Sequence, residues 1–376
     1  MIVPEVKCCT IADMESRKTS VLIAMSGGVD SSTAACLLKE QGFDCHGATM
    51  KLFDTEPDSL KTGKTCCSLS DVEDARNAAY RLGIPFYVFN FREDFRKNVI
   101  ERFVSIYQAA KTPNPCIDCN RFVKFERFLR RCNELDFDYM ATGHYARIGY
   151  DAAARRYLLQ KAVDTEKDQS YVLYAMTQQQ LAKTLFPLGQ YRKQEVREIA
   201  KQNGLTNASK KESQDICFIP DGNYAAFIEL YSGQPLSEGN FVDQQGHVVG
   251  RHRGLIRYTI GQRKGLGIAH STPYYVCAFD RTANTVVLGK EDDLYSQVLE
   301  ADDINLIAVD RIEKPMRVTA KVRYRQREEP AVVEQIEADR VRIVFDQPQK
   351  AVAPGQAVVF YDGDVVVGGG TILQTA

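Results

Sequence analysis

The sequence predicts an α/β protein: a parallel-sheet domain, then a small mixed central domain and a C-terminal β-barrel. From residue 19 to about 215, short apolar strands alternate with amphipathic helices, as in parallel sheets covered by helices on both faces. After residue 217, Gly and Asp/Asn turns separate strand-like runs. At 376 residues the chain is too long for one compact core. The expected parts are a flexible extension at 1–18, the α/β domain at 19–216, the central domain at 217–291 and the barrel at 292–376.

The apolar periodicity places the individual elements. In the α/β domain we expect helices at 33–42, 71–82 and 123–135, and strands at 45–52, 86–91 and 139–142. The acidic first turn of the helix at 71–82 suits the helix dipole, and Gly83 and Pro85 stop it. The later strands are expected at Tyr274–Phe279, Thr285–Leu288, Val318–Arg323, Val341–Phe345, Ala357–Tyr361 and Val365–Gly368.

The most informative stretch is the loop SGGVDSS, residues 26–32. It lies between the apolar run Val21–Met25 and the first expected helix, so it is a strand-to-helix turn. Its two glycines permit a sharp turn, and the loop and helix N–H groups then form an anion site to which Ser26, Ser31 and Ser32 add hydroxyl donors. No lysine follows the loop, which excludes a Walker A motif, and the spacing is not that of a dinucleotide fingerprint. A phosphate-bearing ligand is expected.

Charge and composition limit the partners and the compartment. No apolar run reaches the ~20 residues of a membrane span, and the N-terminus lacks the apolar core of a signal peptide. We therefore expect a cytoplasmic protein without membrane association. A net charge of −1 does not indicate nucleic-acid binding, although basic clusters occur at 251–264 and 321–325. Eleven cysteines, an odd number, argue against a disulfide framework.

Two cysteines lie where chemistry is expected. Cys119 follows the stiff loop TPNPC and falls at or just before the helix expected near Val123, where the helix dipole favours a thiolate. Cys217, in ESQDICF, is the last feature before the β region, so it could close over the site. A thiolate is the nucleophilic form of cysteine.

The loop resembles those of the PP-loop ATP pyrophosphatases, with the adenine nucleotide alpha hydrolase-like fold. These enzymes cleave ATP between the α- and β-phosphates, which implies adenylation of a substrate oxygen. The motifs SGGVDSS, PNPCIDCNRFVKF, ATGHYAR, KDQSYVLY, ESQDICFIP and GQRKGLG occur in the order found in tRNA-specific 2-thiouridylases, from about residue 20 to the C-terminus.

This resemblance implies roles for individual residues. Cys119 matches the catalytic nucleophile, and Cys217 matches the cysteine that carries the persulfide. ATP, with Mg²⁺, is expected to contact Ala24, Met25, Ser26, Gly27, Gly28, Val29, Asp30, Ser31, Met50 and Gly143. The expected tRNA contacts are Asn114, Pro115, Cys116, His144, Lys167, Asp168, Gln169, Arg323, Tyr324 and Gln356. The implied partners are the tRNAs for Lys, Glu and Gln, and a persulfide donor such as a cysteine desulfurase or a sulfur-relay protein.

One departure from the family pattern matters. Cys116 stands where many members have Asp, so Cys116, Cys119 and Cys217 are three thiols that could meet in one pocket. Related RNA thiolases use three cysteines to hold a [4Fe–4S] cluster with one open iron, in contrast to the usual four. The alternatives are a persulfide mechanism, a labile cluster, an incidental third thiol, or a zinc site without an identified fourth ligand. The pairs Cys8–Cys9 and Cys66–Cys67 have no assigned role.

The resemblance implies thiolation of uridine 34 of tRNA: ATP-dependent adenylation at C2, then transfer of persulfide sulfur to give 2-thiouridine, AMP and pyrophosphate. Three other functions compete with this one. One is an amidotransferase-type synthetase such as GMP or argininosuccinate synthetase, which needs neither Cys119 nor Cys217. Another is a tRNA-binding protein or sulfur carrier with a vestigial nucleotide site, against which the intact loop argues. The third is a paralogue that sulfurates a different nucleoside.

Overall fold

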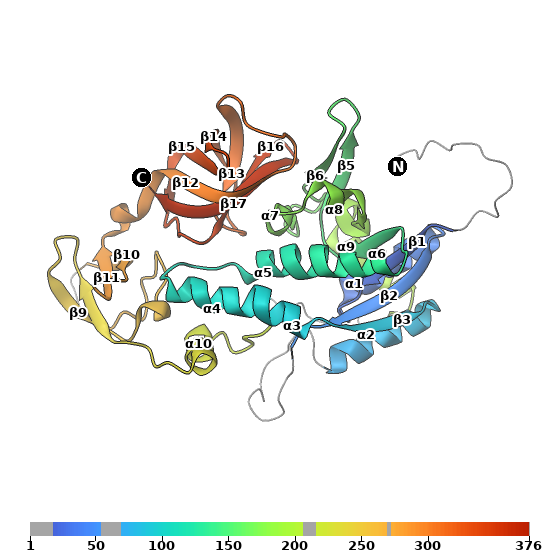
Figure 1. The fold of residues 1–376 in the computed structure, drawn as a ribbon, viewed down its shortest axis with the longest axis horizontal. Coiled ribbons are helices and arrows are strands. Elements are labelled where there is room, and N and C mark those ends of the chain that lie inside the picture. Colours follow the sequence, from blue (N-terminus) through green and yellow to red (C-terminus); the bar gives the residue numbers. More distant parts are fainter. Residues whose placement is uncertain (1–17, 54–68, 206–215, 269–271, 376) are drawn as a thin grey trace. The chain divides into compact units, whose positions relative to one another are not determined.

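A computed structural model describes residues 18–53, 69–205, 216–268 and 272–375 (Figure 1). Its fold divides into two compact units. Unit 1 is formed by the described residues of Met1–Asn98, Ile117–Asp221 and Asp364–Val366. Unit 2 is formed by those of Val99–Cys116, Gly222–Gly363 and Val367–Ala376. Neither unit is continuous along the chain. The extension and the three domains predicted above stay a prediction.

A parallel sheet forms the centre of unit 1. Its strand order is β3-β2-β1-β4-β7, so β1 lies in the middle with β2 and β4 beside it. The bounds are β1 (Ser20–Ala24), β2 (Asp44–Lys51), β3 (Phe86–Asn90), β4 (Tyr139–Thr142) and β7 (Thr184–Leu185). The parallel α/β fold predicted for this part is confirmed.

Helices cover both faces of this sheet. Helices α1 (Val29–Glu40) and α2 (Leu69–Leu82) pack on the face that carries Val21 and Ile23. Phe89 points to the opposite face from Phe86, since side chains alternate along a strand, and it packs on Phe128. The helix from Pro115 to Glu134 therefore lies on that second face. The other helical segments of unit 1 are α3 (Arg92–Phe95), α7 (Ser170–Leu173), α8 (Gln178–Ala182), η3 (Pro187–Gln190) and α9 (Lys193–Gln202).

The helix that carries Cys119 begins earlier than predicted. It starts as α5 (Pro115–Asp118), continues with π-helical hydrogen bonding as η2 (Cys119–Phe128) and ends as α6 (Leu129–Glu134). Proline suits the first helical position because its missing N–H has no partner there in any helix. Cys119 consequently lies one turn inside the helix, and the expectation that it sits at the N-terminus is wrong.

Unit 2 contains two helices and a small sheet ahead of its barrel. A second π-helical segment, η1 (Arg96–Ile100), leads from α3 into α4 (Glu101–Gln108), which packs on α10 (Tyr224–Ser232) through the stacked rings of Tyr107 and Tyr224. The small sheet has the order β10-β11-β8-β9 and its own apolar core around Phe241. Its elements are β8 (Gly239–Val242), β9 (Val248–His252), η4 (Leu255–Arg257), β10 (Tyr275–Asp280), β11 (Thr285–Gly289) and η5 (Glu291–Leu294).

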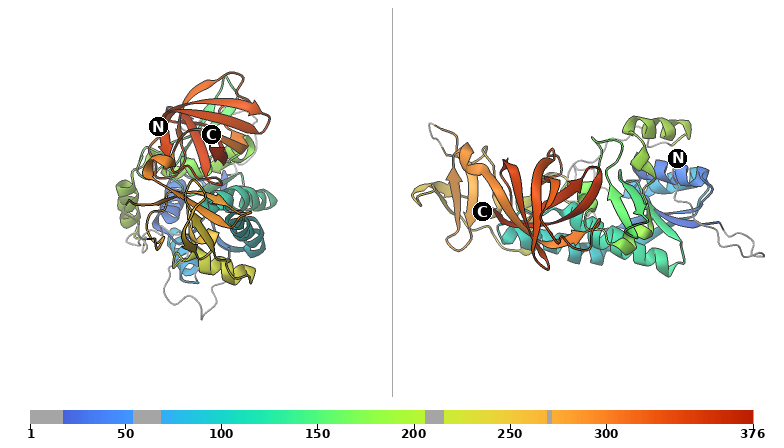
Figure 2. Two further views of the ribbon diagram at one scale, coloured as in Figure 1. Left: turned by 90° about the vertical axis from the view of Figure 1, so that its left-hand side faces the viewer. Right: turned by 90° about the horizontal axis from the view of Figure 1, so that it is seen from above.

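The C-terminal strands close into an antiparallel barrel, which confirms the predicted fold class (Figure 2). The order runs β12-β15-β14-β13-β16-β17, and β12 pairs again with β17. Alternate residues such as Val333, Ile343 and Phe360 fill the interior. The strands are β12 (Tyr295–Leu306), β13 (Met316–Lys321), β14 (Glu329–Glu337), β15 (Arg340–Lys350), β16 (Ala357–Asp362) and β17 (Val365–Thr375).

Several strands were not predicted. The hairpin of β5 (Arg147–Asp151) and β6 (Arg156–Gln160) belongs to unit 1, where Gln160 also pairs with Val365. Strands β12 and β14 were missed because charged residues interrupt their apolar alternation. Among the described helices, none is both long and apolar enough to cross a bilayer.

Candidate functional site

The SGGVDSS loop joins β1 to α1 at the centre of the sheet. Gly27 has φ +74°, and a Cβ there would lie 2.3 Å from the carbonyl oxygen of Asp71, so no other residue fits. Gly28 is the N-cap of α1 and offers no side chain for capping. The first N–H groups of α1 have no partner within the helix, and together with the helix dipole they favour an anion. The local geometry fits an anion, and the binding of a phosphate by these residues stays a prediction.

Serine hydroxyl groups tie the loop to the helix. The Ser31 hydroxyl accepts from the Ser26 N–H at 3.1 Å and donates to the Gly28 carbonyl at 3.2 Å. The Ser32 hydroxyl donates to the same carbonyl at 3.2 Å. The serines predicted as phosphate donors therefore hold the loop in shape in this structure.

The ends of two neighbouring strands complete this side of the site. Ala24 pairs with Ala48 and with Thr142, so Met50 and Gly143 follow at the same edge of the sheet. A Cβ on Gly143 would lie 2.7 Å from the Ser31 nitrogen. Gly143 is thus packed against the first turn of α1, and the structure brings it together with the loop as the sequence predicted.

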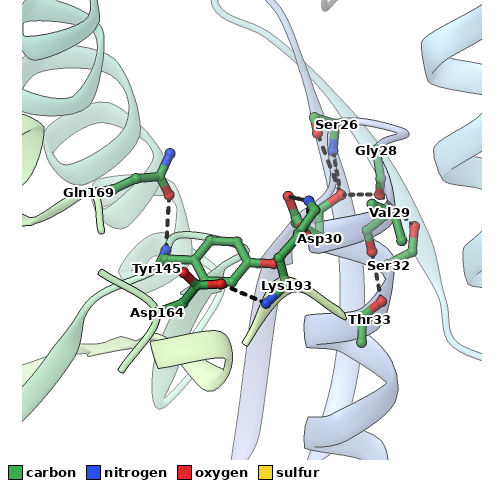
Figure 3. A network of polar contacts seen from close by, with 11 residues as sticks. Ser26, Gly28, Val29, Asp30, Ser32, Thr33, Tyr145, Asp164, Gln169 and Lys193 are labelled. Carbon is green, nitrogen blue, oxygen red and sulfur yellow. Dashed lines mark hydrogen bonds and ion pairs between the residues drawn. The ribbon is translucent and has the colours of Figure 1, made fainter. Parts of the chain in front are cut away.

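A buried lysine and a tyrosine converge on Asp30 of the loop (Figure 3). The Lys193 ammonium donates to both carboxylate oxygens of Asp30, at 2.8 and 2.7 Å, and the Tyr145 hydroxyl donates to one of them at 2.8 Å. The side chains of Lys193 and Asp30 are 10% and 28% exposed. An uncompensated carboxylate at this position would repel a triphosphate. Lys193 therefore neutralises the acidic side chain that the loop carries.

Sequence reasoning missed both Lys193 and Tyr145. Lys193 is the first residue of α9, and its own N–H donates to the Asp164 carboxylate at 2.8 Å. A positive charge in the first turn of a helix is unfavourable, because the N-terminal end of the helix dipole is also positive. A lysine at this position was therefore a sequence signal that its side chain has an acidic partner. Tyr145 directly follows the Gly143–His144 pair, but its partner Asp30 is 115 residues away, so nothing in its surroundings identified it.

Two of the predicted tRNA contacts are engaged in hydrogen bonds within unit 1. The Gln169 side chain accepts from the Tyr145 N–H at 2.9 Å, and the Gln169 N–H donates to the Tyr145 carbonyl at 2.8 Å. The Asp168 carboxylate accepts from the Ala162 N–H at 3.0 Å and from the Ser170 hydroxyl at 2.7 Å. Both residues therefore support the segment that holds Tyr145, and their tRNA contacts stay predictions.

His144, a further predicted tRNA contact, is buried. Its Nδ1 is hydrogen bonded to the Thr142 hydroxyl at 2.7 Å, and its ring packs on Phe125 and Phe186. Burial, helped by the charge of Lys124, lowers the pKa of His144 well below its usual value. The imidazole is consequently neutral at physiological pH.

The two predicted sulfur-handling cysteines both belong to unit 1. Cys119 is 9% exposed, and Cys217 is half-buried in a turn that Phe218 anchors by packing on Phe95. Cys116 is exposed. Among the described residues, which include all three, no group of three or more His, Cys, Asp or Glu side chains could hold a metal ion. The [4Fe–4S] and zinc alternatives stay predictions.

Other cysteines behave as buried apolar residues. Burial raises the pKa of Cys132 to about 12, and burial together with Asp44 raises the pKa of Cys45 to about 11. Cys36 and Cys277 show the same effect. Neutral thiols of this kind are poor nucleophiles. The pairs Cys8–Cys9 and Cys66–Cys67 lie outside the described residues.

The remaining predicted tRNA contacts lie on four segments. Asn114 and Pro115 precede Cys116 at the start of the helix, and Lys167 lies in the turn ahead of α7. The others, Arg323, Tyr324 and Gln356, lie on loops of the barrel.

Comparison with known proteins identifies the family. Profiles described as the tRNA methyl transferase HUP domain, the tRNA methyl transferase PRC-barrel domain and the aminomethyltransferase beta-barrel domain match residues 19–221, 225–290 and 296–372. The chain is 53% identical over 356 residues to the tRNA-specific 2-thiouridylase MnmA of Acetivibrio thermocellus, covering 94% of this chain and 99% of that one. The chain belongs to the tRNA-specific 2-thiouridylase family.

A second relative and a solved structure complete the comparison. The enzyme with the same description from Clostridioides difficile is 50% identical, over 94% of this chain and 98% of its own. A solved NMN synthetase from Francisella tularensis is 16% identical with a TM-score of 0.33, over 58% of this chain and 79% of its own. Membership of the 2-thiouridylase family decides against the amidotransferase-type synthetase and the vestigial carrier. The enzyme is a sulfurtransferase.

Proposed function

We propose that this enzyme adenylates the C2 carbonyl oxygen of uridine 34 in tRNA and replaces that oxygen with sulfur, giving 2-thiouridine, AMP and pyrophosphate. The observation that carries the proposal is the 53% identity to a tRNA-specific 2-thiouridylase over 94% of the chain. The geometry of the loop supports it, because the anion site lacks an internal lysine and is placed at the strand ends of a parallel sheet. The substrates are the tRNAs for Lys, Glu and Gln, and the reaction takes place in the cytoplasm.

The nucleotide site is proposed at the loop. Residues 24–31 hold the phosphates of ATP, and Met50 and Gly143 flank the nucleotide. The Asp30 carboxylate would be one of the ligands of Mg²⁺. Its two oxygens accept hydrogen bonds from Lys193 and Tyr145 and still have lone pairs for a metal ion. When bound, Mg²⁺ would neutralise charge on the phosphates.

Activation precedes sulfur transfer. Uridine 34 leaves the anticodon stack so that its C2 carbonyl can enter the site. The carbonyl oxygen attacks the α-phosphorus of ATP, the bond to the β-phosphate oxygen breaks, and pyrophosphate leaves. The N–H groups of the loop stabilise the developing negative charge.

Sulfur is then delivered through two cysteines. A persulfide donor, such as a cysteine desulfurase or a sulfur-relay protein, transfers sulfane sulfur to Cys217. In one route Cys119 attacks the inner sulfur of that persulfide, a disulfide forms between the two cysteines, and hydrosulfide is released. Hydrosulfide adds to C2 and AMP leaves with the former carbonyl oxygen. A thiol reductant then restores both thiols. In the other route Cys119 first attacks C2 and displaces AMP, and the outer persulfide sulfur then displaces Cys119, which leaves C2 joined to Cys217 through an S–S bond. The freed Cys119 thiolate attacks the Cys217 sulfur, a disulfide forms between the two cysteines, 2-thiouridine is released, and the thiol reductant again restores both thiols.

The cysteine roles are tested by Cys119→Ser and Cys217→Ser. Each variant should lose thiolation by at least about 10³-fold, the scale seen when a nucleophile is removed. ATP and tRNA binding should persist, and Cys132→Ser, at a buried thiol, is the control. Nucleoside mass spectrometry of tRNA measures 2-thiouridine, and pyrophosphate release measures adenylation. Thiolation by either variant at the wild-type rate would remove that cysteine from the mechanism.

A further inference from the structure

A turn of the barrel holds the backbone that precedes Asn114. Gln356 lies in the turn between β15 and β16, and its side-chain nitrogen donates to the carbonyl oxygens of Thr112, at 3.2 Å, and Pro113, at 3.0 Å. In return the Thr112 N–H donates to the Pro354 carbonyl at 2.8 Å. Three hydrogen bonds therefore join residues 354–356 to residues 112–113, and both segments belong to unit 2.

Gly355 lets the two backbones meet directly. Its φ is +89°, and a Cβ there would lie 2.9 Å from the Thr112 carbonyl oxygen and 3.0 Å from the Lys111 Cβ. Only glycine satisfies both the backbone conformation and the close approach. The contact is thus built into the shape of the turn and does not depend on the glutamine alone.

The barrel fixes the turn in place. The Gly355 N–H donates to the Ile372 carbonyl, and the Ile372 N–H donates to the Gln356 carbonyl, each at 2.8 Å. Ile372 lies on β17, the strand that closes the barrel, and its side chain is fully buried. The side chain of Gln356 therefore extends from a rigid frame.

The barrel turn at residues 354–356 holds a short, stiff backbone segment, residues 112–113, which leads into the segment predicted to lie near the target base. Pro113 and Pro115 are both buried, and each proline fixes its own φ near −65°. Asn114 lies between them, and Pro115 opens the helix that carries Cys116. Little conformational freedom remains in the backbone between the Pro113 carbonyl group and Cys116. The position of the Thr112 and Pro113 carbonyl groups therefore determines the position of Cys116.

We propose that Gln356 is a positioning residue whose amide holds the Thr112–Pro113 backbone and thereby sets the place of Asn114–Cys116, where the target uridine docks. The inference rests on the proposed function for the docking of uridine. A glutamine amide has two N–H donors, and the two carbonyl groups use both of them. The side-chain oxygen keeps its capacity to accept a bond from another partner.

Hydrogen exchange tests the contact without ATP, tRNA or activity. Gln356→Leu keeps the volume and removes the donors, and Gln356→Glu keeps the shape but cannot donate, so it serves if the leucine variant fails to fold. Gln347→Leu, at an exposed glutamine of β15, is the matched control. Amides of residues 111–117 should exchange about tenfold faster in the Gln356 variants and at the wild-type rate in the control. Unchanged exchange in both Gln356 variants would overturn the inference.

Single-turnover kinetics separate positioning from a direct tRNA contact. With tRNA saturating, the Gln356 variants should thiolate about tenfold more slowly, while their Kd for tRNA stays within about threefold of wild type. A raised Kd with the saturated rate retained would assign Gln356 to tRNA binding and overturn the positioning role. If the wild-type enzyme forms no 2-thiouridine, the proposed function fails, whereas the exchange experiment still decides whether the turn holds residues 112–113.

Discussion

The nucleotide side and the sulfur side of this enzyme are built in different ways. The loop at 26–32 is shaped by its own glycines and serines and by the strand and helix that adjoin it in sequence. The backbone at Thr112 and Pro113, by contrast, is held by a barrel turn more than 240 residues away. Local sequence therefore specifies where ATP binds, whereas distant contacts specify where the target base segment lies.

The Asp30–Lys193 pair is the exception on the nucleotide side, because its two residues are 163 positions apart. Its removal also offers the largest expected effect. Lys193→Met leaves the Asp30 carboxylate largely buried without its cation, which should cost about 3 kcal/mol in the free energy of unfolding. Pyrophosphate release should fall by at least about 100-fold, because an uncompensated carboxylate repels the triphosphate.

A double variant separates stability from function at this pair. Lys193→Met with Asp30→Asn removes both charges and with them the repulsion of the triphosphate, so it should recover much of the lost stability. ATP binding should stay weak, because the Mg²⁺ ligand proposed at Asp30 is lost as well. Thermal unfolding and an ATP titration measure the two quantities. If Lys193→Met binds ATP normally, the Asp30–Lys193 pair contributes only to stability, and the ATP site is specified by the loop and its sequence neighbours alone.

The next largest effect is expected at the loop glycine. Gly27→Ala combines a left-handed backbone with a Cβ 2.3 Å from the Asp71 carbonyl, whereas Gly42→Ala meets a similar φ of +89° with no atom within 4 Å. We expect about 1 kcal/mol of destabilisation for Gly42→Ala and at least twice that for Gly27→Ala. Only Gly27→Ala should lose ATP binding. Equal losses of stability in the two variants would show that the loss comes from the left-handed backbone conformation and not from the close approach of Gly27 to the Asp71 carbonyl.

The smallest effect concerns pH. Because the pKa of His144 is lowered in the folded protein, His144 takes up a proton below about pH 6.5 in the unfolded chain but stays neutral in the folded one. Stability from this group is complete above that pH and declines by about 1 kcal/mol per pH unit below it. In His144→Asn the fall in Tm between pH 7.5 and 5.5 should be smaller than in wild type. An identical fall would place the pH sensitivity at other groups, such as His252, whose pKa burial also lowers.

The sequence predicted the structure correctly where a short segment alone determines the local conformation. The loop, the helix at 71–82 and the strand at 139–142 lie where periodicity and glycine placement predicted them. The start of the Cys119 helix was missed because two prolines were read as loop, although one of them occupies the first helical position. The partners of Lys193, Tyr145 and Gln356 could not be predicted, since only the folded chain brings each pair of residues near.

The way the chain crosses between its two units bears on how it can be made and truncated. Residues 99–116 interrupt unit 1, and residues 364–366 return to it from within the last strand of the barrel. During synthesis, unit 1 cannot acquire the pairing of Val365 with Gln160 until residue 365 has left the ribosome, 205 residues after its partner. A stop codon at 364 would remove that pairing and also the barrel strand β17. No single cut in the polypeptide yields either unit intact, so gene fragments are poor substitutes for the full-length enzyme.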